Sequence, residues 1–351
     1  MTSPSSRGKL LVRGSINIDE FFVLDHIVRV GETISSTDYS RRAGGKGANQ
    51  AVSAAKAGAA VELAATLGND GAWLKETLAS YGVSQNLLSL DETLPTGRAI
   101  IQLSKATADN SIVLLPGSNF SSQPSPLSLL SPQELSSTFT HLLLQNEIPL
   151  ESTKEALRIA HSAGLTTIMN PSPMLTLEQL DSFEWDNLDW LLINEGEGQD
   201  LVEALSPTTK RAEPGAKTSS EEILRQLRQT KLRNLRGIIM TRGADGVKAG
   251  MRNGTIVSVG AGRVKGGVKD TTGAGDCFTG YFATLLSTLD STSSASIEPI
   301  KLYRILEVAC QAAAMCVEKH GAMESVPSLS QVKERMGEDW LEGQEWDVLL
   351  R

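Results

Sequence analysis

The sequence predicts an α/β fold: a doubly wound, mainly parallel sheet with helices on both faces. Apolar runs alternate with amphipathic segments along the chain, as they do in parallel sheets covered by helices. With 351 residues, 40% of them apolar and 21% charged, the chain can bury a sizeable core. It shows no internal repeat. We therefore expect residues 1–351 to form a single α/β domain with a small appendage.

The individual elements follow from short apolar runs for strands and from helical spacing of apolar residues for helices. The predicted strands are residues 10–16, 61–67, 141–145, 166–169, 190–193 and 237–241. The predicted helices are residues 48–57, 72–81, 152–163, 221–229, 274–287 and 299–319. Residues 206–220, with two prolines and several Ser and Thr residues, are predicted to be a surface-loop insertion. The acidic tail from residue 337 is predicted to pack loosely.

Two stretches break the alternation, because they contain strand-forming residues with no helix between them. Residues 21–42 and 97–115 each resemble two strands joined by a turn. We expect a discontinuous β lid from about residues 20–43 and 96–115, projecting from the edge of the main domain. Since a small sheet with an apolar face needs cover, this lid would join two copies in a homodimer or close over a ligand. The alternative is that these strands extend the main sheet.

Composition limits the classes of partner. The formal net charge of −8 argues against a nucleic-acid-binding surface. No apolar run approaches the ~20 residues needed to cross a bilayer, and residues 1–6 lack the apolar core of a secretory signal. The three cysteines give no disulfide framework, and the four histidines show no metal-ligand spacing. We expect a cytoplasmic protein, with the nucleus as a further compartment, that contacts neither nucleic acid nor membrane.

The most informative segment is residues 270–276 (DTTGAGD), followed by an apolar-periodic helix. A Gly-Ala-Gly turn that opens a helix leaves backbone N–H groups unpaired, and the helix dipole adds partial positive charge. Gly273, Ala274 and Gly275 are therefore a candidate anion cradle. Asp276 would lie beside the anion, and a base that takes a proton from an attacking hydroxyl explains a carboxylate there. By itself the motif also fits an aspartate that caps a helix after a tight turn.

Two further segments carry polar residues suited to a sugar. Residues 44–51 (GGKGANQA) place glycines before a helix but lack the GxxxxGK[ST] spacing of a phosphate loop. Lys46 and Asn49 at the helix start offer a donor and a donor–acceptor amide to hydroxyl groups. Asn17 and Asp19 follow the first predicted strand, where open α/β sheets bind ligands, and would face one side of an extended chain. An Asn/Asp turn is the alternative for this pair.

Taken in order, these segments resemble the ribokinase/phosphofructokinase-B family of carbohydrate kinases. Residues 44–51 resemble the N-terminal signature of the family, and residues 268–280 (VKDTTGAGDCFTG) resemble its C-terminal signature. The short motifs between them also follow the family's order: PTG at 95–97, NSI at 110–112, PG at 116–117, QNE at 145–147, NPSP at 170–173, NEGE at 194–197 and TRGADG at 241–246. Each motif is weak, but their ordered co-occurrence from about residue 10 to residue 327 is specific.

The resemblance implies a kinase that phosphorylates a sugar with ATP, with ribose and its 5-hydroxyl expected. The residues implied to hold the sugar are Asn17, Asp19, Gly45, Lys46, Asn49 and Glu147. Asp276 is implied to be the catalytic base. The amides of Gly273, Ala274 and Gly275 would stabilise charge on the transferred phosphoryl group.

The resemblance also implies a nucleotide site and two kinds of cation. The residues implied to bind ATP are Asn194, Glu197, Thr241, Gly243, Gly246, Gly275 and Cys310. Asn194 and Glu197 would organise Mg²⁺ mostly through water, although such a pair is also typical of a helix start. The residues implied to hold a monovalent cation, usually K⁺, are Asp270, Thr272, Cys316, Lys319, Gly321 and Ser325. Cys310 departs from the family's frequent Asn or His, and Met323 departs from its commoner Gln.

Other functions fit parts of this pattern. A sister kinase would act on fructose, a deoxy-keto sugar acid or adenosine, but no obvious extra cation adjoins the sugar residues to bind an acid. The lid offers no evident stacking platform for adenosine, since Phe21, Phe22 and Tyr39 are its only aromatic residues. A non-catalytic sugar-binding protein would not need Asp276 and the glycine cradle. A dinucleotide-dependent oxidoreductase is excluded because the turn after the first strand lacks GxGxxG.

Overall fold

The computed structural model describes residues 9–107, 109–205, 218–289 and 297–337. Its large sheet has the strand order β14-β13-β12-β11-β10-β9-β1-β4-β5, with β6 also paired to β4. Neighbouring strands run parallel except at β12–β13 and β13–β14. The strands are β1 (Lys9–Arg13), β4 (Ala60–Gly68), β5 (Val83–Ser84), β6 (Leu88–Asp91), β9 (His141–Leu144), β10 (Thr166–Met169), β11 (Trp190–Asn194), β12 (Gly237–Thr241), β13 (Val247–Met251) and β14 (Ile256–Val259).

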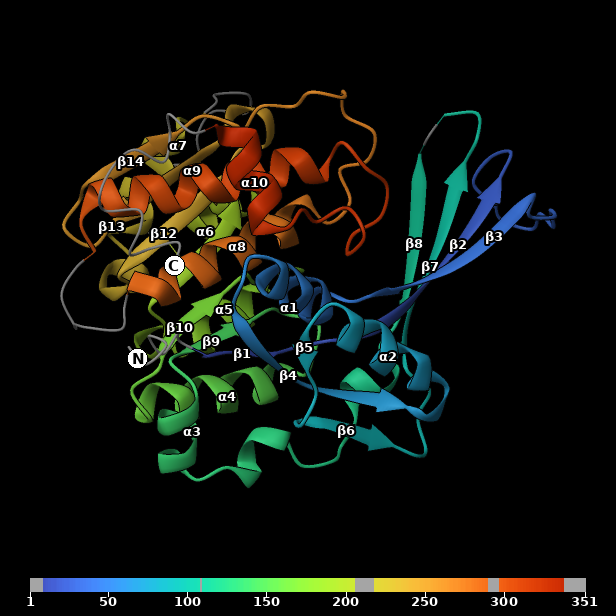
Figure 1. The fold of residues 1–351 in the computed structure, drawn as a ribbon, viewed down its shortest axis with the longest axis horizontal. Helices are drawn as coiled ribbons and strands as arrows, with labels where there is room; N and C mark the ends of the chain where they lie inside the picture. Colours follow the sequence, from blue (N-terminus) through green and yellow to red (C-terminus); the bar gives the residue numbers. More distant parts are fainter. Residues whose placement is uncertain (1–8, 108, 206–217, 290–296, 338–351) are drawn as a thin grey trace.

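Helices cover both faces of this sheet, which confirms the predicted fold class (Figure 1). On one face lie α1 (Lys46–Lys56), α2 (Ala72–Ser80), α8 (Ala274–Leu289), α9 (Pro299–Cys316) and α10 (Leu329–Met336). On the other lie α3 (Pro132–Thr138), α4 (Leu150–Ser162), α5 (Leu177–Ser182), α6 (Glu195–Leu205) and α7 (Ser220–Leu227).

The two faces have separate hydrophobic cores because successive strand residues point to opposite sides of a sheet. In β1, Leu10 and Val12 pack into the core beneath α1 and α8, whereas Leu11 packs into the core beneath α4. In β11, Leu192 packs into the first of these cores and Leu191 packs into the second. The strands are apolar at consecutive positions because both of their faces are buried.

Four further strands form a separate small sheet, here called the lid, that projects from the main body (Figure 1). Its strands are β2 (Asn17–Leu24), β3 (Asp38–Gly44), β7 (Gly97–Ser104) and β8 (Asn110–Leu115), in the order β3-β2-β7-β8. The β2–β3 and β7–β8 pairs are antiparallel hairpins, and β2 pairs in parallel with β7 to join them. The alternative that these strands extend the main sheet is wrong.

An arginine ties the lid to the main body. Arg98 in β7 donates one hydrogen bond to Glu20 of β2 at 2.9 Å. It donates a second to Asp70 of the main body at 2.5 Å. The other carboxylate oxygen of Asp70 accepts from the Thr96 amide, just before β7, at 2.8 Å. Arg98, whose role the sequence leaves open, thus bridges the lid and the body at the point where β7 leaves the body.

Several element boundaries differ from the predictions. The predicted strand 10–16 ends at Arg13, because the chain leaves the large sheet after Gly14 and enters β2 at Asn17. Asn17 and Asp19 therefore lie on a lid strand. Helices α3, α5, α6 and α10 escaped prediction, since helices of 6 to 11 residues give little periodicity to detect. Most of the predicted loop 206–220 and the predicted loose tail lie outside the described residues. Among the helices that the structure describes, none is long and apolar enough to span a membrane.

Candidate active site

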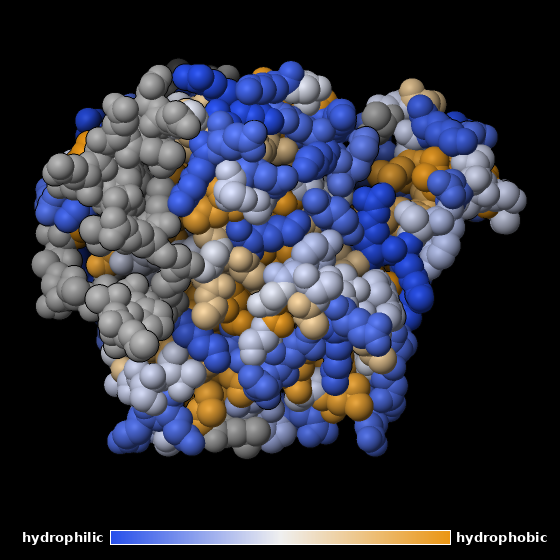
Figure 2. All heavy atoms as spheres, viewed as in Figure 1, coloured by the Kyte–Doolittle hydropathy of each residue, from blue (hydrophilic) through white to orange (hydrophobic). Residues whose placement is uncertain are grey.

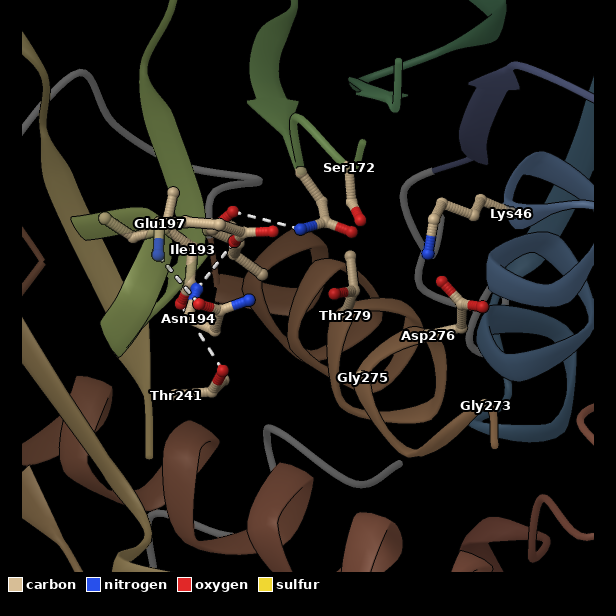
Figure 3. A pocket seen from close by; sticks show the side chains of 12 residues that line it. Lys46, Ser172, Ile193, Asn194, Glu197, Thr241, Gly273, Gly275, Asp276 and Thr279 are labelled. Atoms are coloured by element: carbon tan, nitrogen blue, oxygen red, sulfur yellow. Dashed lines mark hydrogen bonds between the residues drawn. The ribbon is translucent and has the colours of Figure 1, made fainter. Parts of the chain in front are cut away.

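A cavity of about 170 Å³ opens where three neighbouring strands of the large sheet end (Figure 3). Asn170 follows β10 directly, Asn194 ends β11 and Thr241 ends β12. Helix α8 closes the opposite side. The residues lining the cavity are Lys46, Asn170, Ser172, Leu192, Ile193, Asn194, Glu197, Thr241, Gly273, Gly275, Asp276 and Thr279. The carboxyl ends of parallel strands are where open α/β sheets bind ligands.

The predicted anion cradle lies at the start of α8. Gly273 has φ 77°, and a Cβ there would lie 2.7 Å from the Ala322 Cα atom, so only glycine fits. Gly273 and Gly275 line the cavity. The Ala274 amide donates to the Thr271 carbonyl oxygen at 3.3 Å, so this member of the predicted cradle is engaged within its own turn. Asp276 lies in the first turn of α8, as predicted.

Two amide side chains from α1 hold the Asp276 carboxylate. Asn49 Nδ2 donates to Asp276 Oδ2 at 3.0 Å, and Gln50 Nε2 donates to Asp276 Oδ1 at 2.9 Å. The carboxylate is only 8% exposed. Lys46 points toward Asp276 across the cavity (Figure 3). The negative charge of Asp276 raises the pKa of the Lys46 ammonium, against the opposing effect of burial. A cation and a carboxylate thus face each other at the cradle.

The residues predicted to hold the sugar surround this carboxylate on the lid side. Glu147 Oε2 accepts hydrogen bonds from Ser15 Oγ at 2.6 Å and from the Lys46 amide at 2.9 Å. Gly45 caps α1 with φ 88°, and a Cβ there would lie 2.8 Å from the Asn17 nitrogen. The structure thereby brings the start of α1, the start of β2 and the loop after β9 together.

Asp19 and Asn17 belong to the lid side of the same site. Burial, and after it the nearby carboxylates of Glu147 and Asp276, raise the pKa of Asp19 to about 7. These carboxylates therefore lie close enough to affect one another electrostatically. Asn17 is nearly buried, and its Oδ1 accepts from Asn119 Nδ2 at 2.7 Å.

Asn194 and Glu197, which are predicted to bind the nucleotide, bond each other reciprocally at the start of α6. The Asn194 amide donates to Glu197 Oε2 at 2.7 Å, and the Glu197 amide donates to Asn194 Oδ1 at 2.8 Å. The pair thus caps a helix and also lines the cavity. Burial raises the pKa of Glu197, although the bond from Asn194 acts in the opposite direction.

The remaining predicted nucleotide residues divide into two groups. Thr241 and Gly275 line the cavity. Gly243 and Gly246 lie just beyond β12, at a short turn where both have positive φ. Cys310 is buried in α9, where burial raises the pKa of its thiol to about 12. These last three positions do not line the described cavity.

The segments predicted to hold a monovalent cation are joined by Asp270. Its Oδ1 accepts from the Thr272 amide at 2.9 Å, and its Oδ2 accepts from the Gly321 amide at 3.1 Å. Burial alone would raise the pKa of Asp270, but these hydrogen bonds outweigh it and hold the pKa below its usual value. Across the described residues, no cluster of three or more His, Cys, Asp or Glu side chains could hold a metal ion.

The loop that follows α9 is anchored from two sides. Cys316 Sγ and Ser325 Oγ lie 2.9 Å apart, and Ser325 Oγ donates to the Ala322 carbonyl oxygen. Lys56, at the end of α1, donates to the carbonyl oxygens of Met323 and Val326 at 2.7 and 2.9 Å. Lys319 follows α9, and its amide donates to the Cys316 carbonyl oxygen. One helix, α1, therefore contacts both the Asp276 carboxylate and this loop.

Four polar residues that line the cavity or bond to Asp276 were not among the predicted site residues: Gln50, Asn170, Ser172 and Thr279. Gln50 follows Asn49 in the 44–51 motif, and Thr279 lies three residues after Asp276 on the same face of α8. Asn170 and Ser172 follow a buried strand. The rule that ligands bind at the carboxyl ends of strands would have selected these last two.

Comparisons with known proteins identify the family of the chain. The model of the pfkB family carbohydrate kinases matches residues 7–329. Ribokinases of Haemophilus influenzae and Schizosaccharomyces pombe are 30% and 32% identical to the chain; the alignments cover 93% and 92% of it and 98% and 96% of those proteins.

Among solved structures, ribokinases are again similar to this chain. A ribokinase of Cryptococcus neoformans in complex with ADP is 45% identical, with a TM-score of 0.80 over 93% of this chain and 99% of that one. A ribokinase of Arabidopsis thaliana complexed with ribose and ATP is 27% identical, with a TM-score of 0.76 over 94% of this chain and 98% of that one. The chain therefore belongs to the pfkB family of carbohydrate kinases.

Proposed function

We propose that this protein transfers the γ-phosphoryl group of ATP to the 5-hydroxyl of D-ribose, giving ribose 5-phosphate and ADP. The observation that carries the proposal is the position of the Asp276 carboxylate at the glycine turn of α8. It accepts a hydrogen bond from Asn49, lies close to Asp19 as Glu147 does, and also lines the cavity with Asn194 and Thr241. Relatives similar over nearly the whole chain are ribokinases, including one crystallised with ribose and ATP.

In the proposed reaction, Asp276 takes the proton of the 5-hydroxyl while that oxygen bonds to the γ-phosphorus. The bond from the γ-phosphorus to the bridging oxygen breaks, and ADP leaves with that oxygen. The backbone amides around Gly273 and Gly275, together with Lys46, stabilise negative charge on the transferring group. Carboxylates and amides suit a neutral polyol because each accepts a hydrogen bond from a hydroxyl group, and an analogue without that hydroxyl leaves the acceptor unpaired.

A panel assay tests the substrate. We expect ADP release to be fastest with D-ribose when ribose, other pentoses, fructose, a deoxy-keto sugar acid and adenosine are supplied at equal concentration. Faster release with one of the other acceptors would reassign the protein to a sister kinase. Ribose binding without ADP release, from folded protein, would favour a sugar-binding role.

We propose Mg²⁺ as the companion of ATP, held mostly through water near Glu197 and Asn194. The donor set fits, because both side chains line the cavity and offer oxygen atoms, which Mg²⁺ prefers. When bound, the ion neutralises charge on the phosphates. Glu197 and Asn194 keep each other oriented through their reciprocal hydrogen bonds, so the two oxygen groups are fixed before the nucleotide arrives.

We also propose a K⁺ site formed by Asp270, Thr272 and the Cys316–Ser325 loop, mostly through carbonyl oxygens. Asp270 already links the two segments, and Gly273 packs against Ala322 of the loop. Ordering this loop would hold the cradle in its anion-binding geometry. The bound cation would also place positive charge near the transferring phosphoryl group. A low dielectric constant strengthens the attraction between the two.

The K⁺ prediction is that KCl raises kcat or the affinity for ATP, and that NaCl does so less because Na⁺ is smaller. Asp270→Ala should abolish this dependence, since it removes the formal negative charge proposed at the site. The measurement is a titration of KCl against a non-coordinating organic salt at constant ionic strength. Identical rates in both salts would contradict the site, and the Met323 departure would be the first cause to examine.

We propose a homodimer joined through the lid. Its edge strand β8 exposes Ile112, Val113, Leu114 and Leu115, and hydrophobic side chains gather on the lid in Figure 2. An uncovered edge strand with apolar residues is prone to pair with another chain.

The dimer prediction is that light scattering after gel filtration gives the mass of two chains and that Val113→Glu gives one. A Thr107→Glu variant, with the charge placed at the β7–β8 turn instead, is the matched control and should remain a dimer. A wild-type protein that runs as a monomer at assay concentrations would overturn this proposal.

We propose that residues 1–351 work as one kinase domain, with about 20–43 and 96–115 as its lid. The proposed location is the cytoplasm, with the nucleus as a second compartment, and no nucleic acid or membrane is proposed as a partner.

A further inference from the structure

We infer that Gln50 is a positioning residue for the catalytic base and that Gln145 and Asn170 orient it; the inference rests on the proposed role of Asp276. Gln50 is fully buried in the second turn of α1. Its Nε2 donates to Asp276 Oδ1 at 2.9 Å and to Asn170 Oδ1 at 3.1 Å. Its Oε1 accepts from Gln145 Nε2 at 2.7 Å. One side chain therefore links α8, β9 and the end of β10.

The amide of Gln50 can take only one orientation in this chain of bonds. Asn170 Nδ2 donates to the Leu192 carbonyl oxygen in β11 at 3.1 Å, so Asn170 must present its oxygen to Gln50. Asp276 presents a carboxylate oxygen from the other side. Only the NH₂ end of Gln50 satisfies two acceptors, because its oxygen would meet two oxygens if the amide were reversed. The backbone of the large sheet thus sets the direction in which Gln50 donates.

The position of Gln50 suits it to hold the proposed base and not to contact a ligand. Gln50 does not line the cavity, whereas Asp276 does. Asn49 holds the other carboxylate oxygen, and its own Oδ1 is buried without a hydrogen-bond partner in the described structure. Asn49 is also proposed to hold the sugar, whereas every hydrogen bond of the Gln50 side chain is to Asp276 or to the residues that orient it.

Fixing a carboxylate has catalytic value because proton transfer requires the accepting oxygen to lie within hydrogen-bond reach of the hydroxyl. Asp276 carries two side-chain torsions, and a donor on each oxygen restricts both of them. Gln50 is 0% exposed and Gln145 is 1% exposed. A leucine at position 50 would fill this buried space without a donor, so Asp276 Oδ1 would lose its hydrogen bond from α1 and the carboxylate would be free to turn away from the sugar.

The experiment is a double-mutant cycle on kcat with Gln50→Leu and Asp276→Asn. We expect Gln50→Leu alone to lower kcat about tenfold or more while KM for ribose changes less than about threefold. In the Asp276→Asn background, the same change should lower kcat by less than about twofold, because no base remains to be positioned. A purely structural role would give equal losses in both backgrounds.

Two variants keep the test interpretable if Gln50→Leu folds poorly. Gln50→Glu has the same shape and can still accept from Gln145, but it places a carboxylate beside Asp276. We expect the acid limb of its kcat–pH profile to move to higher pH, since two adjacent carboxylates share a proton. Ser53→Ala is the matched control: it removes a buried bond from α1 to the Cys277 carbonyl oxygen one turn away, and kcat should stay within about twofold.

The outcomes separate this inference from the proposed function. Wild-type kcat in Gln50→Leu, with an inactive Asp276→Asn, would overturn the positioning role and leave the base in place. Equal losses of kcat in both backgrounds would also overturn it. Near-wild-type kcat in Asp276→Asn would instead remove the proposed base itself.

Discussion

Asp276→Asn should leave ribose and ATP binding close to wild type but lower kcat by at least about 10²-fold, the usual scale of positioned base catalysis. The amide keeps the shape of the carboxylate but cannot accept a proton at neutral pH. Asp276 lies in the first turn of α8 beside Gly273 and Gly275, and it is held at 2.9 and 3.0 Å by Gln50 and Asn49. A group that only bound substrate would change KM instead.

Binding and turnover should be measured separately, by calorimetry with each ligand and by steady-state ADP release. Because Asn49 and Gln50 both donate toward Asp276, one of the bonds must rearrange when an amide NH₂ replaces an oxygen. A thermal unfolding curve for the variant therefore belongs with the assay. Near-wild-type turnover would exclude Asp276 as the base.

Glu147→Ala should weaken ribose binding by ~1–3 kcal/mol, which is about 5- to 150-fold in Kd, and leave ATP affinity nearly unchanged. The side chain is proposed to accept from sugar hydroxyls. It also accepts from Ser15 Oγ and from the Lys46 amide at the start of α1, so its loss leaves a backbone donor without its partner. Lys46 and Asn49 then become less well placed for the sugar.

Glu147→Gln is the matched control, because its amide oxygen can still accept from the Lys46 amide. Its loss of ribose affinity should therefore be smaller than that of the alanine variant. Calorimetry with ribose and with ATP measures both effects. Equal losses for the two ligands would indicate a folding defect or a wrong assignment of Glu147.

The fold could be predicted from sequence because its main signal is local. Runs such as those in β1 and β11 are apolar at successive positions, and burial on both faces of a sheet requires this. The lid hairpins were visible as strand-forming stretches without a helix. The parallel pairing of β2 with β7, which joins the hairpins, could not be predicted, since it connects residues 80 positions apart that share no local pattern.

The site was predictable where residues fall in motifs and less so where they act through long-range contacts. Asp276, Gly273 and Lys46 lie in the two glycine-rich segments and meet at the cavity. The bond between Gln50 and Asp276 joins residues 226 positions apart, and only the folded chain shows that Gln145 and Asn170 meet the same side chain. Ala274, by contrast, was expected to offer its amide to the anion, but it bonds within its own turn.

The most direct test of the central claim is to identify the product made from ATP and D-ribose by phosphorus NMR. The proposal predicts ribose 5-phosphate formed in equal amount to ADP, and its disappearance in Asp276→Asn. A phosphate on another hydroxyl of ribose, or ADP formed without a phosphorylated sugar, would contradict transfer to the 5-hydroxyl by this site.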